Sequence, residues 1–486
     1  MKKTCLVLLG LLWCAALPAK NFELKSPDGR IALAIDVGER IAYTVRGDGI
    51  PLLDECRLGL RLDRGGTAGP LRLVRHRSGS IDRTFRPAVA YKFSEIRDRC
   101  NTLRLDFRGG WSVEFRAYDD GVAYRFLSDT EGPVEVLGEE FALRLPDAST
   151  AVLQQPGSFR TGYEEAYEEV GTRSWGTAGR LAVLPALFDT KRGYKILVSE
   201  SSLTDYPCLF LTGDGANGMR GVFPKMPLRT EETGDRSVRI LEEAGCIAAT
   251  TGERAFPWRY FVLADEDGDL VETTMTARLA EPCALGDTSW IEPGQVSWEF
   301  WNAASPYGPD VDFVAGFNTA TYKYFIDFAA RFGIPYIIMD EGWAEDTRDP
   351  YTPNPEVDLH ELIRYGEERG IGVILWLTWL TVEKHFDLFE RLSEWGVRGV
   401  KIDFMDRSDQ WMVNYYERVA AEAARHRMVV AFHGAFKPAG LEYKYPNVLA
   451  YEGVRGMENM GGCTPANSLW LPFIRNAVGP MDYTPG

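Results

Sequence analysis

The sequence has few histidines and lacks the short motifs that mark the most familiar catalytic mechanisms. Only 5 of its 486 residues are histidine. It contains no Gly-x-Ser-x-Gly turn, no His-Glu-x-x-His pattern and no glycine-rich phosphate loop. The chain therefore has few of the residues needed for a serine triad, for zinc-dependent hydrolysis or for nucleotide chemistry.

Positive charge is also sparse, and no stretch of the chain concentrates lysine or arginine. The 54 Lys and Arg residues are outnumbered by 70 Asp and Glu residues, which gives a formal net charge of −16. A chain of this sign does not attract phosphate backbones, so we expect no nucleic-acid partner. Disorder is excluded too, because 45% of the residues are hydrophobic and 12% are aromatic.

No apolar run reaches the length of about 20 residues that a membrane-spanning helix needs. One shorter run, residues 5–17, follows Lys2-Lys3 and precedes Pro18-Ala19. This order is typical of a secretory signal peptide, so we expect residues 1–19 to be a signal peptide and the protein to be exported to a Gram-negative-type periplasm. A membrane anchor is the alternative; a lipid on Cys14 is disfavoured because the bulky Trp13 precedes it.

The cysteines show no metal-binding pattern. Of the 8 cysteines, Cys5 and Cys14 lie in the expected signal peptide, and the others are widely spaced without a Cys-x-x-Cys pair. Neither a cysteine zinc site nor a small disulfide-stapled domain is indicated. We expect mostly buried thiols, with occasional disulfides permitted by export.

The remaining chain divides into two parts with different hydrophobic patterns. Residues 20–290 alternate apolar and polar side chains in short runs, such as Ile31–Ile35 and Leu103–Phe107, separated by turn residues. This period of two predicts a large antiparallel β-sandwich. Residues 291–486 instead alternate apolar runs with amphipathic helices, which is typical of parallel βα units.

We expect residues 291–486 to form a (β/α)8 (TIM-type) barrel. An open doubly wound sheet is the alternative, but it would normally place a glycine-rich turn after its first strand, where this chain has Trp298–Asn302. Only six βα units can be counted, so we expect a barrel that is incomplete at its C-terminus. Either the last strands are hidden in irregular segments after Glu452, or the chain is a truncated piece of a longer protein. The expected strands are 296–302, 336–340, 373–379, 399–404, 428–433 and 448–452, and the expected helices are 314–332, 358–369, 382–395 and 410–426.

Polar and aromatic side chains follow the ends of these expected strands, where (β/α)8 barrels carry their active groups. Lys401 and Asp403 are two apart and therefore point to the same side of their strand. An interior salt bridge is the alternative for that pair alone, but acids at several strand ends are harder to explain as packing, because buried carboxylates are costly unless paired or used. The strand-end set is Asp340, Trp343, Trp376, Lys401, Asp403, His433 and Glu452, with Glu458 shortly after.

Paired carboxylates beside tryptophans suit the hydrolysis of sugar acetals. One carboxyl group protonates the leaving oxygen, and the second attacks the anomeric carbon or activates water. Indole rings supply flat faces for the C–H groups of a sugar. The chemistry therefore points to an oligosaccharide or another glycoside as the substrate. We expect no membrane span, and the sequence leaves the oligomeric state open.

Several segments resemble glycoside hydrolase family 97. The resemblance implies an N-terminal β-sandwich, a catalytic (β/α)8 barrel and a small C-terminal β domain, before which this sequence stops. The segments are 116–125, 289–298, 399–406, 451–458 and 471–485, and they span both parts of the chain.

Within that family, the resemblance implies the retaining type. Inverting members carry a His-Glu pair at the fifth strand end, whereas here Gly434 follows His433. Retaining members carry an aspartate at the fourth strand end, which Asp403 matches. By resemblance Asp403 is the nucleophile and Glu458 the acid/base.

The resemblance also implies the other site residues and the activity. Asp340, Lys401 and His433 would bind sugar hydroxyls, with Trp343 or Trp376 as the stacking face. Calcium would be held by Glu164, Glu452 and Glu458; plain solvent exposure is the alternative for Glu164. The expected activity is that of a retaining, exo-acting α-galactosidase. The alternatives are another family α-glycosidase, acting on α-glucosides or β-L-arabinopyranosides, and a catalytically silent sugar-binding protein.

Overall fold

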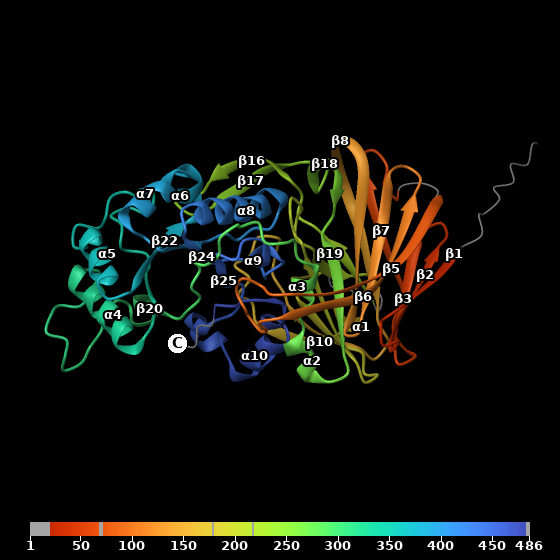
Figure 1. The fold of residues 1–486 in the computed structure, drawn as a ribbon, viewed down its shortest axis with the longest axis horizontal. Coiled ribbons are helices and arrows are strands. Elements are labelled where there is room, and N and C mark those ends of the chain that lie inside the picture. The colour runs from red at the N-terminus through yellow and green to blue at the C-terminus, as the bar shows by residue number, and fades with distance from the viewer. Residues whose placement is uncertain (1–19, 68–70, 177–178, 216–217, 483–486) are drawn as a thin grey trace, which may run out of the picture.

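The computed structural model describes residues 20–67, 71–176, 179–215 and 218–482. In Figure 1 a body of long antiparallel strands lies beside a body of shorter strands wrapped by helices. The expected signal peptide, residues 1–19, lies outside the described residues.

The first body is a β-sandwich built on alternating burial. In β2, for example, the apolar residues Ile31, Leu33, Ile35 and Val37 are buried while the residues between them are more exposed. The 24-residue strand β8 pairs with β4, β7, β15, β18 and β19, so it links the layers of a 17-stranded sheet. The elements are β1 (Lys20–Lys25), β2 (Ile31–Val37), β3 (Ile41–Gly47), β4 (Ile50–Leu62), β5 (Leu73–Phe85), β6 (Ile96–Phe107), β7 (Trp111–Tyr118), β8 (Gly121–Arg144), β9 (Thr150–Gln154), β10 (Tyr167–Gly171), α1 (Thr172–Trp175), β11 (Leu181–Ala182), β12 (Ala186–Asp189), β13 (Lys195–Ser201), β14 (Phe210–Gly213), β15 (Gly218–Val222), β16 (Pro227–Glu232), β17 (Val238–Glu243), β18 (Ala248–Ala255), β19 (Trp258–Ala264), α2 (Asp267–Glu272) and α3 (Met275–Leu279).

The second body is an incomplete (β/α)8 barrel. Its six strands are parallel and hydrogen-bonded in chain order, β20 through β25, within the described residues. The elements are β20 (Val296–Trp298), η1 (Glu299–Asn302), α4 (Thr319–Phe332), β21 (Tyr336–Met339), α5 (Leu359–Glu367), β22 (Gly372–Thr378), α6 (Trp379–Lys384), α7 (Leu388–Trp395), β23 (Gly399–Asp403), α8 (Gln410–Arg425), β24 (Val429–Phe432), α9 (Leu441–Lys444), β25 (Val448–Tyr451), η2 (Met457–Gly462), α10 (Pro465–Trp470), η3 (Leu471–Phe473) and η4 (Asn476–Val478). The expected strand order and the incomplete barrel are confirmed.

The edges β20 and β25 border a large cavity of about 1320 Å³. Side chains that would face the interior of a closed barrel line it, including Trp298, Tyr336, Ile374 and Val429. The cavity is therefore the unclosed interior of the barrel.

Two helix boundaries differ from the sequence-based expectation. The helix expected from residue 314 begins at Thr319, because the Asn318 side chain accepts a hydrogen bond from the Thr321 N–H and caps it there. The single helix expected over 382–395 is two helices, because His385 leaves the helical conformation at φ −125° and ψ 49°. Phe386, in the break, packs its ring 5.7 Å from that of Phe389.

The two bodies share buried polar contacts. The Thr161 N–H donates to the Asp406 carbonyl at 3.1 Å, and the Cys208 N–H donates to the Ser408 carbonyl at 2.9 Å. Lys437 forms an ion pair with Glu200, and both side chains are at most 3% exposed. The sandwich is therefore packed onto the loops that follow β23 and β24.

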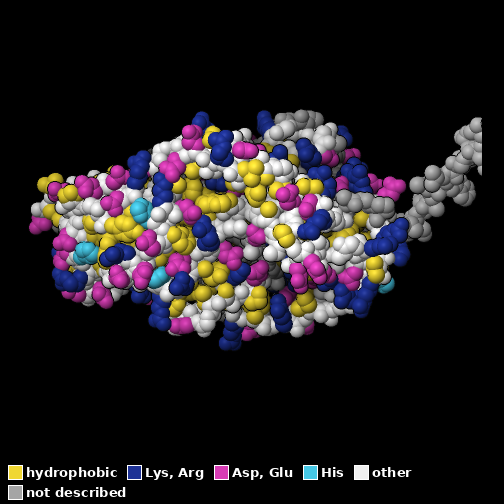
Figure 2. All heavy atoms as spheres, turned by 90° about the horizontal axis from the view of Figure 1, so that it is seen from above, with side chains coloured by type: hydrophobic (Ala, Val, Ile, Leu, Met, Phe, Trp, Pro, Cys, Tyr) yellow, Lys and Arg dark blue, Asp and Glu magenta, His cyan; other side chains and the backbone are white. Residues whose placement is uncertain are grey.

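The surface mixes both signs of charge. Figure 2 shows acidic and basic side chains interspersed over one face of the molecule. Among the described residues, no helix is both long and apolar enough to cross a membrane.

Candidate active site

The polar residues expected at the strand ends lie together on one rim of the barrel. Lys401 and Asp403 end β23, and Asp340 comes directly after β21. His433 follows β24 and Glu452 follows β25. Because parallel strands end at the same edge of a barrel, residues up to 112 positions apart in sequence become neighbours.

A buried lysine joins two of these carboxylates. Lys401 Nζ donates to Asp340 Oδ2 at 2.8 Å and lies 3.4 Å from Asp403 Oδ2. The Lys401 residue is 3% exposed, and its ammonium group lies 4.4 Å from the ring centroid of Trp298. Burial opposes the charge of Lys401, but Asp403 and Asp340 outweigh it and raise the lysine pKa. The salt bridge thus exists, and it is part of the carboxylate cluster at the rim.

Asp403 is held in one orientation and kept ionised. Its Oδ2 accepts a hydrogen bond from Trp376 Nε1 at 3.0 Å, and its Oδ1 accepts one from the Phe404 N–H at 2.6 Å. Burial raises the pKa of Asp403, but the charges of Lys401 and His433 and these hydrogen bonds lower it overall. The backbone of Phe404 has φ 60°, a left-handed conformation that non-glycine residues adopt only at a cost.

His433 is a buried cation between two carboxylates. Its Nε2 lies 2.6 Å from Asp482 Oδ2, and its Nδ1 lies 3.4 Å from Glu452 Oε1. Burial lowers the pKa of His433, but Glu452 and Asp482 together raise it to about 10. The Gly434 N–H donates to Glu452 Oε2 at 2.7 Å, which fixes the carboxylate that His433 faces.

Gly434 occupies a place with no room for a side chain. Its φ is +56°, and a Cβ there would lie 2.7 Å from Asp406 Oδ1 and 3.2 Å from the Met405 nitrogen. A larger residue at 434 would require the loop after β23 to move.

Three carboxylates expected to bind a metal meet at the edge of this site. Oxygens of Glu164, Glu452 and Glu458 lie within 4.8 Å of one another. Glu164 comes from the sandwich loop between β9 and β10, and Asn459 Nδ2 donates to its Oε1 at 3.1 Å. Burial and the charges of Glu452 and Glu458 raise the pKa of Glu164 to about 9.

This donor set fits a calcium ion. Calcium prefers six to eight oxygen ligands, several of them carboxylates. A dication would remove the mutual repulsion that raises the pKa of Glu164. Asp403, His433 and Glu452 also lie close enough to share an ion, but His433 is already paired on both ring nitrogens.

The two tryptophans expected to stack on a sugar differ in position. Trp376 donates to Asp403, so its ring edge lies at the carboxylate. Trp343 is 1% exposed, and its Nε1 donates to the Trp376 carbonyl at 2.8 Å. Trp376 is itself only 3% exposed, so burial does not separate the two rings, and stacking of either ring on a sugar stays a prediction; the hydrogen bond shows that Trp343 also supports the strand that carries Trp376.

Sequence analysis missed several residues that touch the site. Glu299 is 1% exposed, and its Oε1 accepts hydrogen bonds from the Asp340 N–H and the Tyr322 hydroxyl at 2.7 and 2.9 Å. Burial raises the pKa of Glu299 to about 7. Its place directly after the first strand is a signal that could have found it. Asp482 and the Asp235-Arg236 pair had no such signal, because long-range folding brings them to the rim.

Two family models match the chain over most of its length. Residues 24–282 match the one described as Glycosyl-hydrolase 97 N-terminal, and residues 298–454 match the one described as Glycoside hydrolase 97. A protein of Bacteroides thetaiotaomicron named "Retaining alpha-galactosidase" is 37% identical over 506 aligned residues, which cover 100% of this chain and 76% of that protein.

Solved structures share the fold. A family 97 enzyme in complex with acarbose, from Pseudoalteromonas sp. strain K8, is 24% identical with a TM-score of 0.82, covering 96% of this chain and 74% of that one. A β-arabinopyranosidase is also 24% identical, with a TM-score of 0.76 and coverage of 96% and 76%. The sandwich, the parallel barrel and the sequence matches lead to one conclusion: this chain belongs to glycoside hydrolase family 97.

Proposed function

We propose that this family 97 glycosidase is a retaining, exo-acting α-galactosidase. The observation that carries the proposal is the setting of Asp403, an ionised carboxylate fixed by two hydrogen bonds beside a buried lysine. A carboxylate held in this way is suited to attack an anomeric carbon. The 37% identity to a protein named "Retaining alpha-galactosidase" supports the same sugar and the same stereochemistry.

Gly434 supports retention rather than inversion. Inversion needs a carboxylate that activates water on the opposite side of the sugar ring. Position 434 has neither a carboxylate nor space for one, because a Cβ there would lie 2.7 Å from Asp406 Oδ1. The attacking group at this rim is then Asp403 itself.

Catalysis proceeds in two displacements. In the first, a carboxylate oxygen of Asp403 bonds to the anomeric carbon while Glu458 gives its proton to the departing aglycone oxygen. In the second, Glu458 takes a proton from water, which attacks the anomeric carbon and releases Asp403. Partial burial and the charge of Glu452 raise the pKa of Glu458, which suits a group that must begin as an acid. A calcium ion in direct contact with Glu458 would lower that pKa, so the acid role requires the contact to be indirect or to be lost during turnover.

The surrounding groups bind the sugar. Lys401 and Asp340 present a paired donor and acceptor for adjacent hydroxyls. His433, whose two ring nitrogens face Asp482 and Glu452, adds positive charge at the same rim. Trp376 donates its indole N–H to Asp403, so its ring edge lies beside the carboxylate that would bond to the anomeric carbon, and we propose that the indole contacts the sugar there. We propose these four as substrate-binding residues.

Calcium would be held by Glu164, Glu452 and Glu458. When bound, it would supply positive charge beside the acid/base and join the sandwich loop to the barrel rim. Hydrogen bonds from neighbours orient two of these three carboxylates: Asn459 donates to Glu164, and the Gly434 N–H donates to Glu452.

The stereochemical outcome tests the proposal directly. The full-length protein is given calcium and an aryl α-galactoside, and proton NMR follows the first minutes of hydrolysis. We expect α-galactose to appear before mutarotation. First appearance of β-galactose would contradict retention and the role of Asp403.

A variant series tests the nucleophile. Asp403→Ala should lose nearly all turnover, and azide should restore it by forming β-galactosyl azide. Activity that survives without azide would exclude Asp403 as the nucleophile. Parallel assays with α-glucosides and β-L-arabinopyranosides test the other family specificities, and galactose binding without turnover of any of these would indicate a silent binding protein.

We also propose export to the periplasm. The support is the order of Lys2-Lys3, the apolar run 5–17 and Pro18-Ala19. N-terminal sequencing of the protein recovered from an osmotic-shock fraction should begin at Lys20; an intact Met1 in the cytosolic fraction would contradict export.

A further inference from the structure

A hairpin of the sandwich domain reaches the rim of the barrel. Strands β16 and β17 pair only with each other among the described strands, as a two-stranded sheet apart from the large one. Figure 1 shows this hairpin extending toward α6, and Lys384 of α6 lies 2.6 Å from Glu232 of β16. The hairpin turn, residues 233–237, therefore lies against the barrel.

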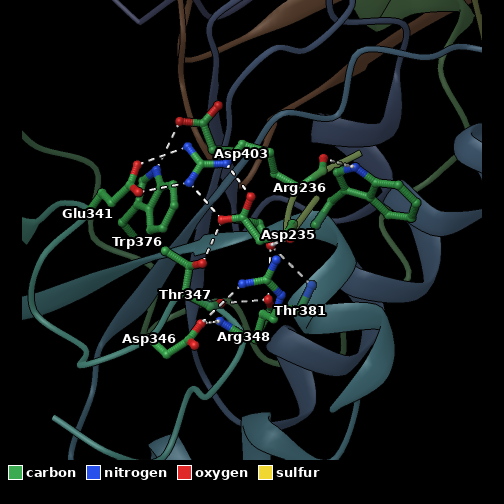
Figure 3. A network of polar contacts seen from close by, with 11 residues as sticks. Asp235, Arg236, Glu341, Asp346, Thr347, Arg348, Trp376, Thr381 and Asp403 are labelled. Atoms are coloured by element: carbon green, nitrogen blue, oxygen red, sulfur yellow. Dashed lines mark hydrogen bonds and ion pairs between the residues drawn. The ribbon is translucent and has the colours of Figure 1, made fainter. Parts of the chain in front are cut away.

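The turn is anchored by main-chain and side-chain hydrogen bonds. The Thr378 hydroxyl donates to the Asp235 carbonyl at 3.1 Å, and Trp379 Nε1 donates to the Arg236 carbonyl at 3.0 Å. The Thr347 hydroxyl donates to Asp235 Oδ2 at 2.6 Å (Figure 3). These partners lie at the end of β22, at the start of α6 and in the loop after β21.

Arg236 is fixed between two carboxylates. Its guanidinium donates to Glu341 at 2.8 and 3.0 Å and to its neighbour Asp235 at 2.7 and 3.0 Å. Figure 3 shows the guanidinium between these carboxylates, with Trp376 and Asp403 nearby. Two bidentate pairs leave this side chain little freedom to move.

The fixed guanidinium lies over both residues that hold Asp403. Its central carbon is 4.8 Å from the ring centroid of Phe404 and 5.8 Å from that of Trp376. Trp376 donates its indole N–H to Asp403, and Phe404 donates its backbone N–H to the same carboxylate. Phe404 also has a left-handed backbone at φ 60°, which needs support from its surroundings.

We propose that Arg236 is a positioning residue for the nucleophile: it holds Trp376 and Phe404, which in turn hold the Asp403 carboxylate. The proposal rests on the role assigned to Asp403 under the proposed function. It makes the sandwich domain a contributor to catalysis through a residue more than 160 positions before Asp403 in sequence. A lysine would keep the charge but lose the planar, bidentate contact, so it should replace Arg236 only in part.

Steady-state kinetics of Arg236→Ala, Arg236→Lys and a matched control test the proposal. Arg239→Ala is the control, because Arg239 lies on the same hairpin and pairs only with Glu231 of the opposite strand among the contacts described. For Arg236→Ala we expect kcat on an aryl α-galactoside to fall about 10- to 100-fold with KM nearly unchanged, because a small displacement of a reacting group has this effect. The kcat of Arg236→Lys should lie between those of wild type and Arg236→Ala. Millimolar guanidinium should restore part of the activity of Arg236→Ala and should leave the activity of Arg239→Ala unchanged.

Hydrogen exchange of the full chain separates this proposal from the proposed function. Without substrate, peptides covering 376–381 and 403–406 should exchange faster in Arg236→Ala than in wild type or Arg239→Ala. If wild type hydrolyses no α-galactoside, the proposed function fails while this measurement still tests the positioning.

Three results would overturn the proposal: a wild-type kcat in Arg236→Ala, an equal loss in Arg239→Ala, or unchanged exchange in both peptides. If Arg236→Ala does not fold, the same comparisons are made with Arg236→Gln and Arg236→Lys.

Discussion

Replacing Lys401 by methionine should destabilise the protein far more than the loss of a surface ion pair. The ammonium group is buried and lies 2.8 Å from Asp340 Oδ2 and 3.4 Å from Asp403 Oδ2. At an effective dielectric constant of about 20, these separations correspond to Coulomb energies of about 6 and 5 kcal/mol. The cost of taking the three charges out of water offsets much of that attraction, so we expect a net loss of about 3–5 kcal/mol in the free energy of unfolding.

Urea unfolding followed by tryptophan fluorescence measures this loss. The matched control is Lys191→Met, because Lys191 also lies 2.8 Å from its partner, Asp189, but the side chains are 41% and 32% exposed. Such an exposed pair should contribute less than about 1 kcal/mol. The double variant Lys401→Met/Asp340→Asn should regain part of the loss, since it removes one of the carboxylates left unpaired. A loss for Lys401→Met no larger than the control's would refute the reasoning.

Three further predictions concern the same rim. Calcium should raise the Tm of wild type and should raise the Tm of Glu164→Gln much less. The apparent affinity for calcium, measured by calorimetry, should increase from pH 6 to pH 8, because Glu164 has a pKa raised to about 9 and must release a proton to bind the ion. A calcium affinity that does not change with pH would contradict this prediction. Trp376→Phe should move the acid limb of the pH profile of kcat/KM to higher pH. Loss of the indole hydrogen bond raises the pKa of Asp403, and Asp403 must be ionised to react. An acid limb at the wild-type pH would argue against the hydrogen bond from Trp376 to Asp403. Because the pKa of His433 is raised to about 10, its stabilising contribution is complete below about pH 6.5 and is lost as the pH rises toward 10. The difference in free energy of unfolding between wild type and His433→Gln should therefore shrink between pH 6.5 and pH 9.5, and a constant difference would show that His433 is neutral in the folded protein.

Much of the rim could be predicted from the sequence because it depends on local pattern. Apolar strands are recognisable from composition, and the ends of parallel strands meet at one edge whatever the rest of the chain does. The sequence pattern alone predicts that five polar residues share this edge, and they lie together in the structure: Asp340, Lys401, Asp403, His433 and Glu452.

The contributions from outside the barrel strands could not be derived in this way. Arg236 lies on a hairpin of an all-β domain, and nothing in its neighbouring residues indicates that it contacts Glu341, 105 positions later. Asp482 reaches His433 across 49 positions through irregular chain. Glu164 was placed only by resemblance, since glutamates at 165, 168 and 169 surround it in the same loop and its pattern alone is that of an exposed segment.

The contacts between sandwich and barrel have a consequence for recombination between related enzymes. A chimera that joins the sandwich of one relative to the barrel of another would preserve both folds yet mix partners across the loops after β23 and β24. The buried ion pair of Glu200 with Lys437 would be left half-formed wherever only one parent has it. A chimera should therefore fold and function better when the sandwich loops and the barrel rim come from the same parent. A crossover at the boundary between the two domains would separate these contacts.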